Sequence, residues 1–397
     1  MKIVRKLLFS IIALISVALT LGVSTYAWFE NKTKVNIEGS RLEITGGLGF
    51  EISIDGKNFS NDLTTEQMKM AIVKASDPVK YDFYDGKLVT TADKKQVSTT
   101  EIDKIFTDVL LLSPVTSKDG ITFSNLTGSE VPKSSGKFVE FDIWFKTTTN
   151  DPNHSSTYDI YLAGKENKIV DENGDIVVDE SANPNRTGTK ITSEKADITL
   201  IDEMTLFDRV TNQIVKKNAT ETIEVYTSNA IRLSAEDTTP EPKAGESQET
   251  LEKLPPIIYE LTDSNDLGSY ATDYNKQAQL GDPSKITEED KLYNSNINAM
   301  FTYYNNLRPY SKLDKYLMSY ENKPKTVRKL TDIDAEGNVI RSKNNPTILN
   351  LDARSELTRK KKITFRIWLE GWDADCFDGL NKSISVKLEF NSVRIAV

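Results

Sequence analysis

Few residues in this chain could carry acid–base or nucleophilic chemistry. His154 is the one histidine and Cys376 the one cysteine among 397 residues. A His-Glu-x-x-His zinc site needs two histidines, and any Ser-His-Asp triad would have to use His154. Cys376 could pair with His154 only through fold geometry, and a buried thiol is the simpler interpretation. Ser134 and Lys137 have the spacing of a Ser-Lys nucleophile pair, but they occupy a polar turn before a strand pattern. We therefore predict that the protein is not an enzyme.

Two acidic clusters offer the carboxylate oxygens that calcium prefers. The first, in the segment EGWDADCFDG, comprises Glu370, Asp373, Asp375 and Asp378. The second comprises Asp332, Asp334 and Glu336. The second cluster is close to the opening of an EF-hand loop, but its twelfth position is Lys343 where that loop needs a bidentate Glu. The alternative interpretation of both clusters is a solvated turn. Apart from calcium, we expect no cofactor.

Composition limits the partners and the means of stabilisation. The net charge of −9 argues against a nucleic-acid partner, which needs clustered Lys and Arg. The one basic cluster, 359–362, is interpreted as a solvated entry to a strand. Charged residues make up 27% and hydrophobic residues 38% of the chain, which suits a soluble folded protein. A single cysteine cannot form an internal disulfide, so stability must come from burial and sheet hydrogen bonds.

Alternation of apolar and polar residues predicts strands toward both ends of the chain. The alternating segments are GFEISIDG (49–56), FVEFDIWFK (138–146), ITFRIWLEG (363–371) and SISVKLEF (383–390). Trp144 and Trp368 fall on the polar faces of their strands, where a loop or insert is expected to cover them. Further strands are predicted within 158–164 and 222–235. Polar turns with Gly predict hairpins at 169–178 and 332–341.

Two capping boxes predict helices from Thr64 to Ala75 and from Ser98 to about residue 112. Residues 236–256 are polar and contain proline, as a linker would, and two short helices are expected between 290 and 320. The fold class is therefore mainly β: an antiparallel, jelly-roll-like β-sandwich with a few short helices. We expect a single domain over residues 28–397, with a large insertion at about 240–350.

The first 27 residues have the pattern of a secretory signal peptide. Lys2, Arg5 and Lys6 precede the uncharged run 7–23, and small residues stand at positions 25 and 27. This pattern predicts cleavage between Ala27 and Trp28. The alternative is an uncleaved membrane anchor, although the run is short beside the about 20 residues of a spanning helix. In both cases the chain from Trp28 onward is expected outside the membrane, secreted or at the cell surface.

The segment STYAWFENKT resembles the signal-to-mature junction of exported Gram-positive proteins that are processed by a SipW-type signal peptidase. The matching positions are Thr25, Tyr26, Ala27, Trp28, Phe29, Glu30 and Asn31. This group includes the TasA-like biofilm-fibre subunits and the camelysins, and later segments such as FVEFDIWFK and RIWLEGWDADC are similar to those of other members. The resemblance implies a jelly-roll fold and a place in the biofilm matrix. Camelysins are classed as metalloproteases, but this chain lacks the histidines for such a site.

Two functions follow as hypotheses. The first is an exported, non-enzymatic structural protein, a fibre subunit or matrix protein whose partners are further copies of itself or other matrix proteins. Its N-terminal strand would add to a neighbouring sandwich through alternating apolar residues, namely Val35, Ile37, Leu42 and Ile44. The alternative for this strand is pairing within its own sheet. The second function is an extracellular carbohydrate- or calcium-binding sandwich.

Overall fold

The computed structural model describes most of the two sheets and the helices that cover them. The described ranges are 35–46, 49–109, 111–117, 119–125, 129–148, 156–162, 168–170, 176–178, 189–200, 204–208, 213–241, 253–259, 270–272, 327–328, 347–353, 359–371, 376 and 382–396. The predicted signal segment 1–27, His154, the acidic cluster at 332–336, the hairpin at 332–341 and the helices expected between 290 and 320 all lie outside these ranges.

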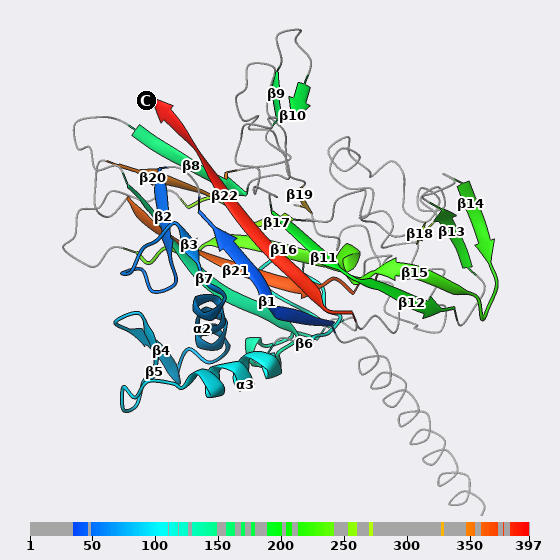
Figure 1. Ribbon diagram of the computed structural model, residues 1–397, viewed down its shortest axis with the longest axis horizontal. Coiled ribbons are helices and arrows are strands. Elements are labelled where there is room, and N and C mark those ends of the chain that lie inside the picture. Colours follow the sequence, from blue (N-terminus) through cyan, green and yellow to red (C-terminus); the bar gives the residue numbers. More distant parts are fainter. Residues whose placement is uncertain are drawn as a thin grey trace, which may run out of the picture.

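In the described residues, one sheet has seven strands in the order β20-β8-β22-β1-β3, with β11 beside β22 and β6 beside β1 (Figure 1). Its strands are β1 (Val35–Thr45), β3 (Asp62–Leu63), β6 (Leu111–Leu112), β8 (Ser156–Leu162), β11 (Lys190–Ser193), β20 (Leu349–Asp352) and β22 (Ile384–Ala396). We call it the first sheet. Its pairings are antiparallel, except that β1 runs parallel to β22.

The second sheet has the order β19-β17-β16-β21-β7-β2. Its strands are β2 (Phe50–Ser53), β7 (Phe138–Thr147), β16 (Ile231–Asp237), β17 (Ile257–Tyr259), β19 (Val327–Arg328) and β21 (Lys360–Leu369). Strand β21 lies at the centre, and its residues from Ile363 to Leu369 are all buried. Because it pairs over most of its length with both β7 and β16, it organises the whole sheet.

The two sheets pack face to face through the residues that alternation predicted to point inward. Phe390 of the first sheet contacts Phe145 and Phe365 of the second, with ring centroids 4.9 Å and 5.6 Å apart. The inward residues of β7, β21 and the first half of β22 are fully buried: Val139, Phe141, Ile143, Phe145, Ile363, Phe365, Ile367, Leu369, Ile384, Val386, Leu388 and Phe390. The predicted mainly-β sandwich is confirmed, and the jelly-roll connection stays a prediction.

Smaller elements surround the sandwich. The hairpins and small sheets are β4 (Tyr81–Tyr84) with β5 (Lys87–Thr90), β9 (Lys168–Val170) with β10 (Ile176–Val178), β12 (Lys195–Thr199) with β15 (Thr222–Tyr226), and β13 (Met204–Asp208) with β14 (Gln213–Lys217) and β18 (Tyr270–Thr272). The hairpin β9–β10 was predicted and is confirmed. Two short 3-10 turns are η1 (Lys133–Ser135) and η2 (Thr227–Ala230).

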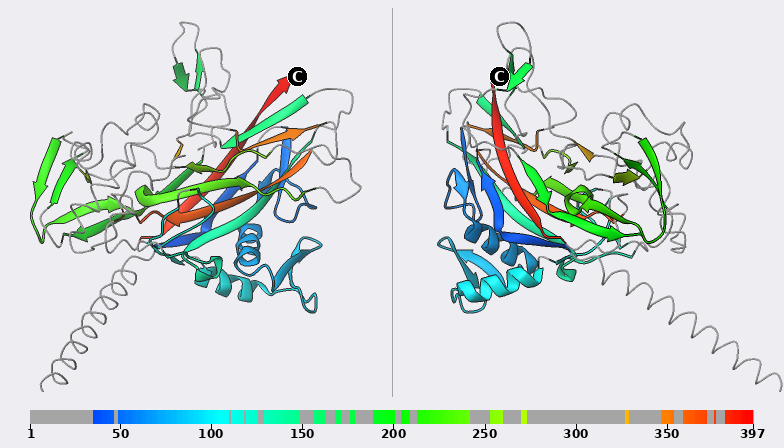
Figure 2. Two further views of the ribbon diagram at one scale, coloured as in Figure 1. Left: turned by 180° about the vertical axis from the view of Figure 1, so that it is seen from behind. Right: turned by 45° about the vertical axis from the view of Figure 1, so that its right-hand side comes forward.

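Helix α2 (Thr65–Ser76) packs against β1 and β7, and helix α3 (Thr99–Val109) packs against α2. Thr64 and Gln67 form the predicted capping box of α2, and the Ser98 hydroxyl accepts a hydrogen bond from the Glu101 amide at the start of α3. Both helices lie on the same side of the sandwich (Figure 2). Strand β2 pairs with the last four residues of β7. In the described part of the chain, no helix has the length and hydrophobicity needed to cross a membrane.

Two details differ from the sequence-based expectation. The segment predicted as an insertion contributes strands at both ends: β17 pairs with β16, and β20 pairs with β8. The basic cluster 359–362 is not a solvated strand entry, because β21 already begins at Lys360. Lys361 is only 3% exposed, and Lys362 is held by a carboxylate of β7.

Candidate functional site

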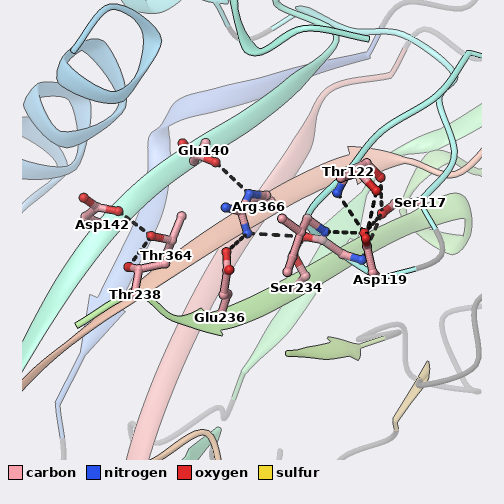
Figure 3. A network of polar contacts seen from close by, with 12 residues as sticks. Ser117, Asp119, Thr122, Glu140, Asp142, Ser234, Glu236, Thr238, Thr364 and Arg366 are labelled. Atoms are coloured by element: carbon pink, nitrogen blue, oxygen red, sulfur yellow. Dashed lines mark hydrogen bonds and ion pairs between the residues drawn. The ribbon is translucent and has the colours of Figure 1, made fainter. Parts of the chain in front are cut away.

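The outward face of the second sheet carries a ladder of charged and hydroxyl side chains across β7, β21 and β16 (Figure 3). Arg366 lies at its centre. Its Nε is 2.6 Å from Glu140 on β7, and its Nη1 is 2.7 Å from Glu236 on β16. Cross-strand pairing places these three residues on one face, since Arg366 is the ladder partner of Glu140. One guanidinium therefore joins the three central strands through two carboxylates.

The ladder continues one step along the strands. Asp142 accepts hydrogen bonds from the Lys362 ammonium at 2.9 Å and from the Thr364 hydroxyl at 2.7 Å. The Thr364 and Thr238 hydroxyls are 2.7 Å apart. Burial by itself would raise the pKa of Asp142, but the charge and hydrogen bond of Lys362, the Thr364 hydroxyl and the charge of Lys74 together hold that pKa below its ordinary value. The carboxylate is thus kept ionised as a structural partner.

Two loops with the same sequence pattern, Ser-x-Asp-Gly-x-(Asn/Thr)-Phe, are fastened to this face. The first is 53–59, SIDGKNF, and the second is 117–123, SKDGITF, which begins 64 residues later. In both loops the glycine amide donates to the serine hydroxyl, at 3.0 Å and 2.9 Å. In both, the serine hydroxyl donates to the aspartate, and two following amides donate to the same aspartate oxygen at 2.8 Å. The flanking residues close each loop with an antiparallel bridge, Ile52 to Ser60 and Thr116 to Ser124.

The aspartates of the two loops, Asp55 and Asp119, have the same electrostatic environment. Burial raises the pKa of each carboxyl. For Asp55 the amides of Asn58 and Lys57 and the Ser53 hydroxyl outweigh that effect. For Asp119 the equivalent donors are the amides of Thr122 and Ile121, with the Thr122 and Ser117 hydroxyls. Both pKa values therefore lie below the ordinary aspartate value.

Each loop presses its glycine against the sheet. Gly56 has a φ of +70°, and a Cβ there would lie 2.8 Å from the ring of Trp144. Gly120 has a φ of +73°, and a Cβ there would lie 2.5 Å from the Cβ of Ser234. The Ser234 hydroxyl also donates to the Gly120 carbonyl at 2.6 Å. Only glycine fits both the backbone conformation and the space at these positions.

Trp144 and Trp368 point outward from the second sheet, and each is covered by a loop, as the sequence predicted. Trp144 is half-buried, with the loop 53–59 on its ring and the Lys360 ammonium 5.3 Å from its centroid. Trp368 is fully buried beneath the second loop, where Phe123 meets it edge-on at 5.2 Å and stacks on Phe138 at 4.0 Å. These rings form a small second core on the outer face, together with Val115, Val131 and Ile258.

Of the four predicted calcium ligands, Glu370 lies in the described part of the chain. Glu370 is fully buried, and its Oε2 accepts a hydrogen bond from the Trp368 indole at 2.9 Å. The other three predicted ligands, Asp373, Asp375 and Asp378, lie outside the described residues. Within the described ranges, no group of three or more His, Cys, Asp or Glu side chains could hold a metal ion. Glu370 is therefore a buried hydrogen-bond acceptor, and the calcium site stays a prediction.

The predicted assembly strand lies in the protein's own sheet. Strand β1 includes Val35, Ile37, Leu42 and Ile44. Ile37 and Leu42 pair in parallel with Ile384 and Val386 of β22, with a register shift between the two pairs. Val35 pairs with β6, and Ile44, only 1% exposed, pairs with β3. Pairing within its own sheet was the alternative interpretation of this segment.

The arrangement described above joins β7, β21 and β16 through ion pairs and hydrogen bonds. Cys376 is buried in the main core, as its alternative interpretation predicted. Sequence reasoning missed the two loops, although their shared seven-residue pattern was readable. Comparison of the chain with protein-family models, with curated proteins and with solved structures finds no match.

Proposed function

We propose that the protein is an exported, non-enzymatic structural subunit of a cell surface or extracellular matrix, and that it assembles by exchange of its N-terminal strand. The observation that carries the proposal is the position of β1. It is the first described strand after the predicted cleavage site at Ala27–Trp28, and it lies beside the long strand β22. A strand near a chain terminus can be replaced by the same strand of a neighbour without any other change in fold.

The local structure of β1 supports exchange. Its register shifts between Ile37 and Leu42, and its further pairings in the described residues are two short ones at its ends, with β6 and with β3. Pairing of this kind holds the strand less uniformly than a continuous ladder on both sides. If each subunit donates β1 to the next, the contact is head-to-tail, and such a contact produces filaments when it does not close.

A disulfide that locks β1 into its own subunit tests the proposal. Glu43 pairs directly with Lys387, and neighbouring strand residues lie at separations that a disulfide can span. The variant is Glu43→Cys with Lys387→Cys, in a Cys376→Ser background. We expect filaments of the processed protein by electron microscopy when the disulfide is reduced, and monomers when it is formed. The Cys376→Ser protein alone is the matched control.

Two results would contradict the proposal. The unlocked protein could remain monomeric at high concentration, in which case assembly is not its function. The oxidised variant could form filaments as readily as the reduced one, in which case assembly does not use β1. The alternative function is a calcium- or carbohydrate-binding sandwich, whose predicted calcium ligands are Glu370, Asp373, Asp375 and Asp378.

A further inference from the structure

A buried ion pair lies on the inward face of the second sheet. The Lys361 Nζ on β21 is 3.7 Å from the Asp237 Oδ2 on β16, and the two side chains are 4% and 0% exposed. Asp237 is the ladder partner of Ile363, so Lys361, two residues earlier, is its diagonal neighbour on the same face. The cross-strand partner of Lys361 on β7 is the core residue Phe145. Two opposite charges therefore meet at the margin of an aromatic and aliphatic core.

The two carboxylate oxygens of Asp237 have different surroundings. Oδ1 accepts hydrogen bonds from the Thr239 amide at 3.0 Å and from the Thr239 hydroxyl at 2.6 Å. The same hydroxyl oxygen accepts from the Lys362 amide at 3.0 Å, which fixes its position. Oδ2 faces the Lys361 ammonium and accepts no hydrogen bond within the described structure. One oxygen is thus held by two donors and the other is not.

The two side chains are buried together in imperfect ion-pair geometry. Burial penalises both charges, and the penalty is recovered only when the geometry is excellent and the remaining lone pairs are satisfied. The separation of 3.7 Å and the unsatisfied Oδ2 fall short of that condition. Transfer of one proton from Lys361 to Asp237 gives an amine beside a carboxylic acid, and a lysine amine without its extra proton is a nucleophile.

We propose that Lys361 and Asp237 condense to an amide cross-link between β21 and β16. The Lys361 Nζ forms a bond to the Asp237 Cγ, and the Cγ–Oδ2 bond breaks. Negative charge that develops on Oδ1 is stabilised by the Thr239 amide and hydroxyl, which act as an oxyanion hole. Of the three ammonium protons, one stays on the amide nitrogen and two leave with Oδ2 as water. No oxidant, metal or other reactant is required.

The cross-link would lie at the base of the predicted insertion. Asp237 is the last residue of β16 and Lys361 the second of β21, and the segment 240–350 lies between them in sequence. A covalent bond there fixes both ends of that segment to the sandwich. It also gives a protein with one cysteine a covalent tie between strands. The proposal does not depend on filament assembly.

Mass spectrometry of the full chain tests it directly. The wild-type protein is expected to be lighter by one water than its sequence mass. Tandem spectra of a digest should contain a branched peptide that joins residues 237 and 361. Lys361→Arg keeps the charge but provides no amine. The mass of this variant is therefore expected to equal the mass calculated from its sequence. Asp237→Asn should reach the same linked product by losing ammonia in place of water.

Three outcomes would overturn the cross-link. The folded wild-type protein could keep its full mass after long incubation. It could lose a water without any peptide joining residues 237 and 361. The loss could also persist in Lys361→Arg, which would place the dehydration elsewhere. Each measurement is made on the wild-type chain or compared with it, so a variant that folds poorly does not decide the result.

Discussion

Replacement of Gly120 by alanine tests whether the second Ser-x-Asp-Gly loop is clamped to the sheet. The residue has a φ of +73°, and its missing Cβ would fall 2.5 Å from the Ser234 Cβ and 3.1 Å from the Ile258 Cγ1. Gly136 provides a matched control. Its φ is +67°, and no atom lies within 4 Å of the position of its Cβ. The two substitutions share the backbone cost and differ in the steric one.

The expected magnitudes follow from these two terms. A left-handed conformation costs alanine about 1–2 kcal/mol, and the stiffer unfolded chain returns about 0.4–1 kcal/mol. Gly136→Ala should therefore destabilise the protein by about 1 kcal/mol. Gly120→Ala adds overpacking of about 1–3 kcal/mol, because the nearest atom is a β-carbon on a central strand that cannot swing away. The total for Gly120→Ala is about 2–4 kcal/mol.

Denaturant titration followed by tryptophan fluorescence measures both variants. Trp368 is a suitable reporter, since Phe123 of the same loop packs on its ring. We expect the denaturant concentration at the unfolding midpoint to fall for both variants, and to fall further for Gly120→Ala. The slope of the unfolding free energy against denaturant concentration should stay unchanged. Equal losses of unfolding free energy in the two variants would refute the reasoning, because they would show that the loop moves away from Ser234 at no cost.

Three further predictions follow from the other sites. Asp55, Asp119 and Asp142 have pKa values below the unfolded value of about 3.9. Their contribution to the unfolding free energy is therefore present above that pH and is lost as pH falls through the folded pKa. Between about pH 4 and pH 2, the unfolding free energy of Asp119→Asn should therefore fall less than that of the wild type. An equal fall in the two proteins would contradict the lowered pKa of Asp119. Calcium should leave the thermal midpoint unchanged, because Glu370 is fully buried and its Oε2 accepts a hydrogen bond from the Trp368 indole; a calcium-dependent rise that Asp375→Asn abolishes would favour the binding-module function. N-terminal sequencing of protein from the cell surface should begin at Trp28, whereas a chain that retains residues 1–23 would indicate a membrane anchor.

Period-two alternation was sufficient to predict the inward faces of the main strands. The stretches 139–145 of β7, 363–369 of β21 and 384–390 of β22 have an apolar residue at every second position, so their buried faces could be read from the sequence. The same pattern placed Trp144 and Trp368 on outward faces and required a cover over them. It could not show that β1 pairs in parallel with β22. That contact joins residues more than 300 positions apart, and no local pattern encodes it.

The polar ladder was hidden for a related reason. Glu140, Asp142 and Arg366 alternate with apolar residues, and alternation alone assigns such positions to solvent. The Arg366 side chain is nevertheless only 4% exposed, because the loop 117–123 and the neighbouring strands enclose it. A sequence shows which face a residue occupies but not whether another segment covers that face.

The repeated loop shows how such a cover can be specified locally. The pattern Ser-x-Asp-Gly-x-(Asn/Thr)-Phe encodes its own closure, since the aspartate accepts from the two amides that follow the glycine. The glycine then permits contact with the sheet, and in the second loop the final phenylalanine packs on Trp368. The first copy covers Trp144 on β7 and the second reaches Ser234 on β16, so the two copies hold separate parts of one face. A chain without disulfides thus fastens its outer layer through turn chemistry, while the buried pair of Lys361 and Asp237 offers a covalent tie on the inner one.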